Sequence, residues 1–292
     1  MVVFSFLLYY LILIPLSVLP FFVLQGISSF FYFLLYRVVG YRKKVVMENI
    51  RNSFPEKTEA EQLEICRKFY KFLGDLFLES LKTLTISEKS LKKHVRCKNP
   101  EVLDNYYDQG KSVIITVGHF NSWELLLTSS NSFVKHNIVV IYQPLTNTYF
   151  DKKLIAARRK LGTTMLPAKE VKQFFAQREK DQLTATVFAI DQSPANSNNC
   201  YWMEFLHQET GVLFGAEKYA KDFNEPVVFA RLNKLKRGYY ELEFTDVVAE
   251  PQKTTYGEIT EKSTRLLEKD IVANPEFWLW SHRRWKHKRS GK

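Results

Sequence analysis

The sequence has few cysteines, and their arrangement excludes two kinds of small-domain scaffold. The three that occur are Cys66, Cys97 and Cys200, which lie far apart and form no CxxC pair. An odd number of widely spaced cysteines provides neither a disulfide framework nor a zinc knuckle. We therefore expect the main body of the protein to face a reducing compartment.

A biased, low-complexity composition is also missing. Of the 292 residues, 46% are hydrophobic and 15% are aromatic, values typical of globular proteins and unlike those of disordered or collagen-like chains. The length suits one large domain or two small ones. A packed hydrophobic core is expected.

Broad basicity is lacking as well, although the formal net charge is +11. Residues 37–51 have a local balance of +4, residues 281–292 carry six basic and no acidic side chains, and together they account for +10 of the total. No broad basic surface of the kind that binds nucleic acid is implied. A Lys or Arg beside an apolar anchor gains about 1 kcal/mol from anionic lipid. The residues predicted to contact membrane headgroups are Arg42, Lys43, Lys44, Arg283 and Arg284.

Charged side chains are entirely missing from residues 1–36. About 20 apolar residues span a hydrocarbon core of about 30 Å, so this segment is predicted to be a membrane anchor. Pro15 and Pro20 would kink or interrupt a helix. They favour a span from about Val2 to Leu24, followed by an interfacial helix from about Ile27 to Tyr36.

Two other interpretations of this apolar segment stay open. A cleaved signal peptide is one, but the usual basic start is missing and the run is longer than the usual stretch of about 7 to 15 residues. A re-entrant or monotopic anchor is the other. Because the basic residues follow the apolar run, the positive-inside rule places residues 37–292 in the cytoplasm. We expect these residues to form a single domain.

Hydrophobic periodicity after the anchor predicts an α/β fold. A helical pattern runs from about Val45 to Leu84 and is interrupted near its start by Pro55. Short β-branched runs then alternate with helical patterns, which predicts a mixed, mostly parallel sheet flanked by helices. The predicted strands are Ser112–Val117, Ile138–Tyr142, Leu183–Ile190, Pro226–Leu232 and Tyr239–Phe244. The predicted helices are Trp123–Ser130, Phe150–Leu161, Lys169–Arg178, Ala216–Phe223 and Tyr256–Ala273.

The segment after the first predicted strand is suited to acid–base chemistry. Its sequence, GHFNSWE, ends at Glu124, and either Asn121 or Ser122 can begin a helix. His119 would then lie in the turn, with Glu124 close enough along the helix to reach back to the imidazole. An imidazole with a pKa near 6.5 can accept a proton from a hydroxyl, and a carboxylate on its other nitrogen fixes the tautomer. On spacing alone, a structural role for such a pair is more common.

The segment GHFNSWE resembles the HX4(D/E) motif of acyltransferases, and further blocks resemble the late lipid A acyltransferases. Members of that family move an acyl chain from acyl carrier protein to a hydroxyl of a lipid A precursor. Seven further blocks in the family's order, from anchor to tail, are far more specific than the short motif. They are VVMENIRNSFPEKT (Val45–Thr58), GDLFLESLK (Gly74–Lys82), IYQPLTN (Ile141–Asn147), ARRKLGT (Ala157–Thr163), IDQSP (Ile190–Pro194), FLHQET (Phe205–Thr210) and WLWSHRRWK (Trp278–Lys286).

The resemblance implies roles for the candidate residues. His119 would be the general base for the acceptor hydroxyl, and Glu124 would orient it. Arg158 and Lys160 would contact the oxyanion of the tetrahedral intermediate or a substrate phosphate, with a solvated helix face as the alternative. The residues expected to contact substrate are Asn121, Gln143, Asp191 and Gln192. For the last two, capping of a loop is the alternative.

The resemblance also implies partners and a location. The acyl donor would be acyl carrier protein, the acceptor a lipid A precursor or related glycolipid, and the location the cytoplasmic side of the bacterial inner membrane. We expect no cofactor and no metal ion, because basic residues around His282 and His287 would repel a divalent cation. The tryptophans of the last block suit either a lipid headgroup boundary or the cover of the sheet.

Two departures from the family pattern concern anion binding. Gln143 stands where the family often has Arg, and Lys160 stands where the second Arg of R-x-R would be. Neither side chain offers a bidentate guanidinium contact, which affects the acceptor's phosphate contacts rather than the reaction. Acyltransferases of this fold that act on a lysophospholipid, an amino-acid lipid or another glycolipid stay open as alternatives, and so does a non-catalytic membrane scaffold.

Overall fold

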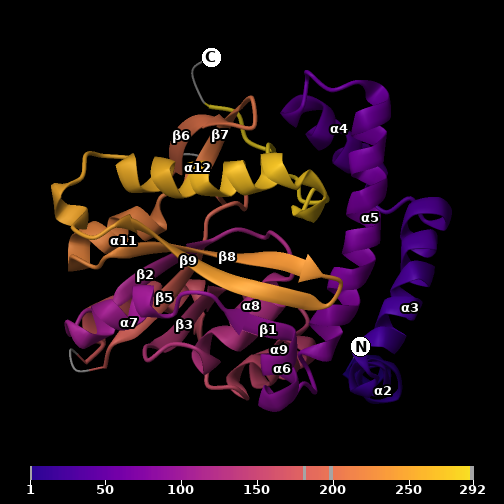
Figure 1. Ribbon diagram of the computed structural model, residues 1–292, viewed down its shortest axis with the longest axis horizontal. Helices are drawn as coiled ribbons and strands as arrows, with labels where there is room; N and C mark the ends of the chain where they lie inside the picture. Colours follow the sequence, from indigo (N-terminus) through magenta and orange to yellow (C-terminus); the bar gives the residue numbers. More distant parts are fainter. Residues whose placement is uncertain (1, 180–181, 197–199, 290–292) are drawn as a thin grey trace.

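The computed structural model describes residues 2–179, 182–196 and 200–289 and contains a seven-stranded mixed sheet (Figure 1). The strands are β1 (Val95–Cys97), β2 (Val113–Val117), β3 (Asn137–Tyr142), β4 (Thr164–Pro167), β5 (Thr184–Ala189), β6 (Cys200–Phe205), β7 (Gln208–Leu213), β8 (Val227–Lys236) and β9 (Tyr239–Val248). The main sheet has the order β1-β9-β8-β2-β5-β3-β4, and β6 and β7 form a separate hairpin. Only β8 and β9 pair antiparallel within the main sheet. The predicted mixed, mostly parallel sheet is confirmed.

All five predicted strands are present, as β2, β3, β5, β8 and β9. The prediction missed β1 and β4 at the two edges, and the hairpin of β6 and β7. The edge strands have only three and four residues, which is too short for a periodic pattern to stand out. The hairpin strands carry polar and charged residues among their apolar ones.

Helices cover both faces of the sheet, with α12 on one side and α6 and α7 on the other in Figure 1. They are α4 (Lys43–Ser53), α5 (Glu59–Lys82), α6 (Glu88–His94), α7 (Glu101–Asp108), α8 (Trp123–Ser129), α9 (Thr148–Arg159), α10 (Val171–Gln177), α11 (Gly215–Phe223) and α12 (Glu258–Ala273). The central strand β2 contacts both layers. Val113, Ile115 and Val117 pack in a cluster with α6, α7 and α8. Ile114 packs with α10, α11 and α12, so the strand is buried along its whole length.

The apolar N-terminal segment forms two helical pieces that meet at Pro20. The pieces are α1 (Val2–Leu8), which continues through a π-helical turn (Tyr9–Leu13) into α2 (Ile14–Val18), and α3 (Phe21–Phe33), which continues into a second π-helical turn (Leu34–Val38). The expected interruption at Pro20 is confirmed, whereas a single span from Val2 to Leu24 is wrong. Pro15 does not end the helix, because the π-helical turn Tyr9–Leu13 runs directly into α2, which contains it. Among the described residues, Phe21–Val38 is long and apolar enough, by length and composition alone, to cross a membrane.

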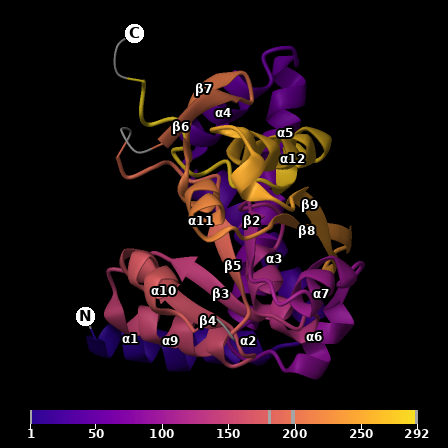
Figure 2. The same cartoon turned by 90° about the vertical axis from the view of Figure 1, so that its left-hand side faces the viewer.

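The helix α3 packs along α5, and Figure 1 shows the two helices side by side. Gly74 of α5 makes this close approach possible. A Cβ atom there would lie 2.9 Å from the backbone oxygen of Ser28 in α3, closer than packed atoms allow. In Figure 2 the earlier helix α1 lies beside α9.

Buried polar contacts fix these N-terminal helices to the sheet domain. Ser28 Oγ donates to the carboxylate of Asp75 in α5. Arg237, from the turn between β8 and β9, binds that carboxylate with Nη2 2.5 Å from Oδ1. Lys82 Nζ donates to the carbonyl oxygens of Ser17 and Leu19, at 3.0 and 2.8 Å, and so satisfies the end of α2.

Candidate active site

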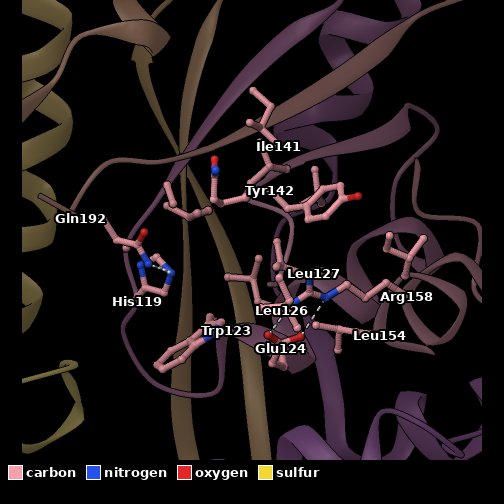
Figure 3. A pocket seen from close by; sticks show the side chains of 18 of the residues that line it. His119, Trp123, Glu124, Leu126, Leu127, Ile141, Tyr142, Leu154, Arg158 and Gln192 are labelled. Carbon is pink, nitrogen blue, oxygen red and sulfur yellow. Dashed lines mark hydrogen bonds and ion pairs between the residues drawn. The ribbon is translucent and has the colours of Figure 1, made fainter. Parts of the chain in front are cut away.

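Three neighbouring parallel strands end at one pocket, which Figure 3 shows from close by. His119 follows β2, Gln192 follows β5, and Gln143 follows β3; all three line a cavity of about 240 Å³. Parallel strands have their carboxyl ends at the same edge of the sheet, where α/β folds place binding residues. The topology therefore joins residues that are far apart in the sequence.

The turn between β2 and α8 holds His119 at this edge. Asn121 adopts a left-handed conformation with φ at +54°, which Asn tolerates better than most residues. Its backbone N–H donates to the carbonyl of Phe277 at 2.9 Å, and its side-chain amide donates to the carbonyl of Leu232 at 2.8 Å. Asn121 is buried, so the structure corrects the expectation that it contacts substrate. It shapes the turn instead.

Asp191 is the carboxylate that contacts the imidazole of His119. Its Oδ1 lies 2.7 Å from Nδ1 of His119, and its Oδ2 accepts the backbone N–H of His119, also at 2.7 Å. Trp278 Nε1 donates to the same Oδ2 at 2.7 Å. Because Nδ1 faces a carboxylate it carries the proton, so Nε2 accepts the amide N–H of Gln192 at 3.1 Å. Gln192 lines the pocket as expected, whereas Asp191 lies behind the imidazole.

The two charges of this pair stabilise one another. Burial lowers the pKa of His119, but the charge and hydrogen bond of Asp191 raise it more, and the result lies above the usual 6.5. Burial raises the pKa of Asp191, but the charge of His119 and the hydrogen bonds from His119 and Trp278 hold it below the usual 3.8. An ionised Asp191 therefore favours the imidazolium form that a general base becomes when it accepts a proton.

The side chain of Glu124 forms hydrogen bonds with Arg158 and none with His119. Nη2 of Arg158 lies 2.6 Å from Oε1 of Glu124, and Nε lies 3.1 Å from Oε2. Both side chains are almost fully buried, with 11% of each exposed. The expected contact with the imidazole is thus corrected. Glu124 lies in the first turn of α8, where it faces the guanidinium on α9, and two charge-assisted hydrogen bonds are a stronger attraction than one to a neutral ring.

The remaining predicted site residues divide into two groups. Arg158 and Gln143 line the pocket. Lys160 follows the last residue of α9, is exposed, and has its Nζ 3.4 Å from the carbonyl oxygen of Ile86. It does not line the cavity. The substitution of Lys for Arg at this position therefore leaves the pocket wall unchanged.

The predicted headgroup residues lie around α4 and the C-terminal segment. Arg42, Lys43, Lys44 and Arg283 line a groove of about 860 Å³. Arg284 is an exception, because it is buried and donates through Nη2 to the carbonyl of Gly211 at 2.9 Å. Burial lowers its pKa to about 10. The prediction that Arg284 contacts headgroups is therefore wrong; its side chain joins the C-terminal segment to β7.

The tryptophans of the last sequence block belong to the interior. Trp278 is 2% exposed and Trp280 is fully buried, and both pack in a cluster with α4 and α5. Of the two interpretations of these indoles, the structure thus favours a role in the core. Trp285 is partly exposed and donates through Nε1 to Oγ1 of Thr210 at 2.7 Å.

Some functional candidates were not found in the sequence. Trp123 packs edge-to-face against His119, with ring centroids 5.2 Å apart; it lies inside the motif, but its neighbours gave no hint of this contact. The apolar wall could not be separated from ordinary core residues either. It includes Leu126, Leu127, Val140, Leu154, Ile155 and Val187. In the part of the chain that the structure describes, no three His, Cys, Asp or Glu side chains are grouped to hold a metal ion.

Comparisons with known proteins agree with this arrangement of blocks. The family model described as bacterial lipid A biosynthesis acyltransferase matches residues 1–287. The chain is also similar to a lipid A biosynthesis lauroyltransferase of Escherichia coli (strain K12), with 20% identity over 257 residues that cover 87% of this chain and 82% of the relative. Since the family model spans almost the whole sequence, this chain belongs to the bacterial lipid A biosynthesis acyltransferase family.

Proposed function

We propose that the protein is a membrane-bound O-acyltransferase that moves a fatty acyl chain from an acyl thioester to a hydroxyl of a lipid A precursor. One observation carries the proposal. A half-buried histidine with an ionised carboxylate behind it lines a pocket that most of its lining residues make apolar, in a chain that belongs to this family. The pocket suits the acyl chain, and the imidazole suits activation of a hydroxyl.

His119 acts as the general base in this proposal. Its Nε2 takes the proton of the acceptor hydroxyl while the oxygen attacks the thioester carbonyl carbon. The tetrahedral intermediate then loses its C–S bond, and the leaving sulfur takes the proton from the imidazolium. The products are the acylated lipid and the free thiol of the donor. Because the nucleophile belongs to the acceptor, no covalent acyl-enzyme is required.

The apolar wall of the pocket binds the acyl chain. Each buried CH₂ group contributes about 0.8 kcal/mol, so a chain along Leu126, Leu154 and Val187 is held mainly by burial. Arg158 is the proposed contact of the oxyanion or of a substrate phosphate. Arg158 donates two of its five N–H groups to Glu124, so its guanidinium keeps donors for a ligand. Gln143 at the pocket rim is a further substrate contact.

The proposed donor is an acyl carrier protein, and the proposed location is the cytoplasmic face of the inner membrane. Residues 1–36 serve as the anchor, and the uncovered side of α3 supports this, because Phe22, Phe30 and Phe33 are 53–74% exposed. The cationic groove begins where α3 ends. Its Arg42, Lys43, Lys44 and Arg283 side chains suit anionic headgroups.

A lipid analysis tests the proposed function. We would compare the lipid A of the source bacterium lacking this gene after complementation with wild type, with His119→Ala or with His207→Asn. His119→Ala should lower turnover by about 10²- to 10⁴-fold, so only wild type and the control should restore the missing acyl mass. His207 is an exposed histidine in the β6–β7 turn with a positive φ, a conformation that Asn tolerates.

Each result of this comparison has a distinct meaning. Loss of one acyl chain from lipid A, restored by wild type and His207→Asn but not by His119→Ala, supports the acceptor and the base together. An unchanged lipid A with another lipid altered keeps the transferase and replaces the acceptor. Equal rescue by His119→Ala overturns the proposed chemistry.

A further inference from the structure

We infer that Asp191, which the indole of Trp278 holds in place, orients the catalytic base and stabilises its protonated form, and that the motif carboxylate Glu124 does not orient it. The inference rests on the proposed function, because it assigns a positioning residue to the general base of that reaction. It differs from the motif-based expectation, which pairs His119 with Glu124.

Asp191 forms two hydrogen bonds with His119. One carboxylate oxygen contacts ring Nδ1 and the other accepts the backbone N–H of the same histidine, each at 2.7 Å. Two contacts from one rigid carboxylate to the main chain and side chain of one residue leave the imidazole little freedom to rotate. The contact also assigns the proton to Nδ1, which leaves the Nε2 lone pair free to accept a hydroxyl proton.

The two contacts between Asp191 and His119 are shielded from water. The side chain of Asp191 is 2% exposed, so water does not compete for its oxygens. Trp278 donates to Oδ2 at 2.7 Å, and it is itself buried between α5 and the turn that holds His119. A buried carboxylate needs several donors to remain ionised, and the indole supplies the third. Trp278, an indole of the tail that precedes several basic residues, thereby acquires a role at the site.

Both carboxylate oxygens of Glu124 pair with Arg158 and not with His119. Its two oxygens hold the guanidinium of Arg158 in a two-pronged ion pair, which satisfies the charge of both groups. Removing one member would leave the other buried and unpaired. Its charge also raises the pKa of His119, but less than Asp191 does. Glu124 therefore positions Arg158 on the pocket wall, and it acts on His119 only through its charge, without a hydrogen bond.

Gln192 completes the environment of the ring on the pocket side. Its amide N–H donates to Nε2 at 3.1 Å, which is the atom that must accept the hydroxyl proton. An amide carries both a donor and an acceptor, so it can donate to the neutral ring and accept from the imidazolium. The acceptor hydroxyl must take the place of this amide at Nε2 before proton transfer.

The proposal predicts opposite shifts of the acidic limb in the pH profile of kcat/KM. Activity needs neutral His119, so it rises with pH through the pKa of this residue. Asp191→Asn removes the charge that raises this pKa, leaves burial to lower it, and moves the limb to lower pH. Trp278→Phe removes a donor that competes for Asp191, which strengthens the attraction to the imidazolium and moves the limb to higher pH. Glu124→Gln should give a smaller downward shift than Asp191→Asn.

Rates provide the second readout. Asp191→Asn should lower kcat by about 10²- to 10⁴-fold. General-base assistance is worth about this much, and the corresponding Asp→Asn change in a Ser-His-Asp triad costs about 10⁴-fold. The KM for either substrate should change much less, because Asp191 does not line the pocket. Asp270→Asn is the matched control, since Asp270 is a carboxylate with only 12% of its side chain exposed, paired with Arg231 at 3.2 Å and outside the pocket. It should leave the limb in place.

The experiment uses the full-length protein in detergent micelles with an acyl carrier thioester and a lipid A precursor. The pKa of His119 is measured in parallel by NMR of histidine-labelled protein, with its signal assigned by comparison with His119→Ala. A lower pKa of His119 in Asp191→Asn, together with a higher one in Trp278→Phe, supports the inference. This holds even if the wild-type protein shows no turnover, a result that would count against the proposed function alone. A larger downward shift in Glu124→Gln than in Asp191→Asn overturns the inference. If Asp191→Asn does not fold, the direction of the Trp278→Phe shift decides.

Discussion

At the scale of single residues, Glu79 is a further buried carboxyl group. It lies on α5, is 4% exposed, and accepts a hydrogen bond from Tyr240 Oη at 2.7 Å. Its other oxygen, Oε1, is buried without a hydrogen-bond partner among the described residues. Burial raises the pKa of Glu79 to about 7, and the hydrogen bond from Tyr240 offsets only part of that effect. This group therefore binds a proton more tightly in the folded protein than in the unfolded chain.

The sign of the effect on stability follows from linkage. An acid whose pKa is raised on folding stabilises the fold below its unfolded pKa, near 4.5, and loses this contribution as the pH rises through about 7. The difference corresponds to about 3 kcal/mol at 1.36 kcal/mol per pKa unit. Glu79→Gln cannot ionise, so its free energy of unfolding should decline less than that of wild type across this range.

Chemical denaturation at about pH 5 and about pH 8 measures this difference. Comparing the two proteins at each pH removes the contribution of His119, which both share. Equal changes in unfolding free energy for wild type and Glu79→Gln would show that Glu79 is already ionised at neutral pH in the fold.

The active-site residues show how far sequence reasoning reaches at this scale. His119 could be found because it stands in a short motif after a strand, and Gln192 because it follows another strand. The partnership of His119 with Asp191 could not be found, since 72 positions separate them and the adjacency of β2 and β5 is a property of the sheet order. Glu124 was assigned to the imidazole by spacing, but Arg158 on α9 competes for it.

At the scale of elements, the contact between α3 and α5 depends on small side chains. Phe21, Leu24 and Ser28 are buried at helical spacing on the side of α3 that faces α5, and Gly74 lies opposite Ser28. The mainly apolar composition of α3 predicted a membrane segment but gave no sign of this contact with α5. The π-helical turns were equally invisible, because no residue pattern marks them.

Gly74→Ala tests this seam. Its Cβ would lie 2.9 Å from the Ser28 backbone oxygen, so the helices must separate, at a cost of about 1–3 kcal/mol for overpacking. The matched control is Gly26→Ala, because Gly26 lies in α3 itself with nothing within 4 Å of a Cβ atom. This control should be neutral or stabilising by up to about 1 kcal/mol. Thermal unfolding in detergent should show a lower Tm for Gly74→Ala only; equal Tm values would mean that α3 adjusts freely.

At the scale of the whole molecule, apolar surface and positive charge meet at one end of α3. The side of α3 away from α5 exposes aromatic rings, and Arg42 and Lys43 of the groove begin only a few residues after the helix. Contiguous exposed apolar surface of this kind marks an interaction site. Together the two features support the proposed membrane attachment, in which the helix lies among acyl chains and the cations at the headgroups. The proposed acyl pocket then belongs to a body that Asp75 and Arg237 fix to α3.

Replacing Phe22, Phe30 and Phe33 together by Ser should detach the protein from membranes without unfolding it. These rings are 74%, 63% and 53% exposed, so they contribute little to the core. Full burial of one Phe in a bilayer is worth about 1.5–3 kcal/mol, and 1.4 kcal/mol is a factor of about ten, so partition into anionic vesicles should fall at least about tenfold. Tyr256→Ser with Val272→Ser is the control, because these side chains are 71% and 56% exposed and lie far from α3 along the chain. Equal partition of both variants would mean that α3 does not enter the membrane, and the attachment would then have to come from α1 and α2.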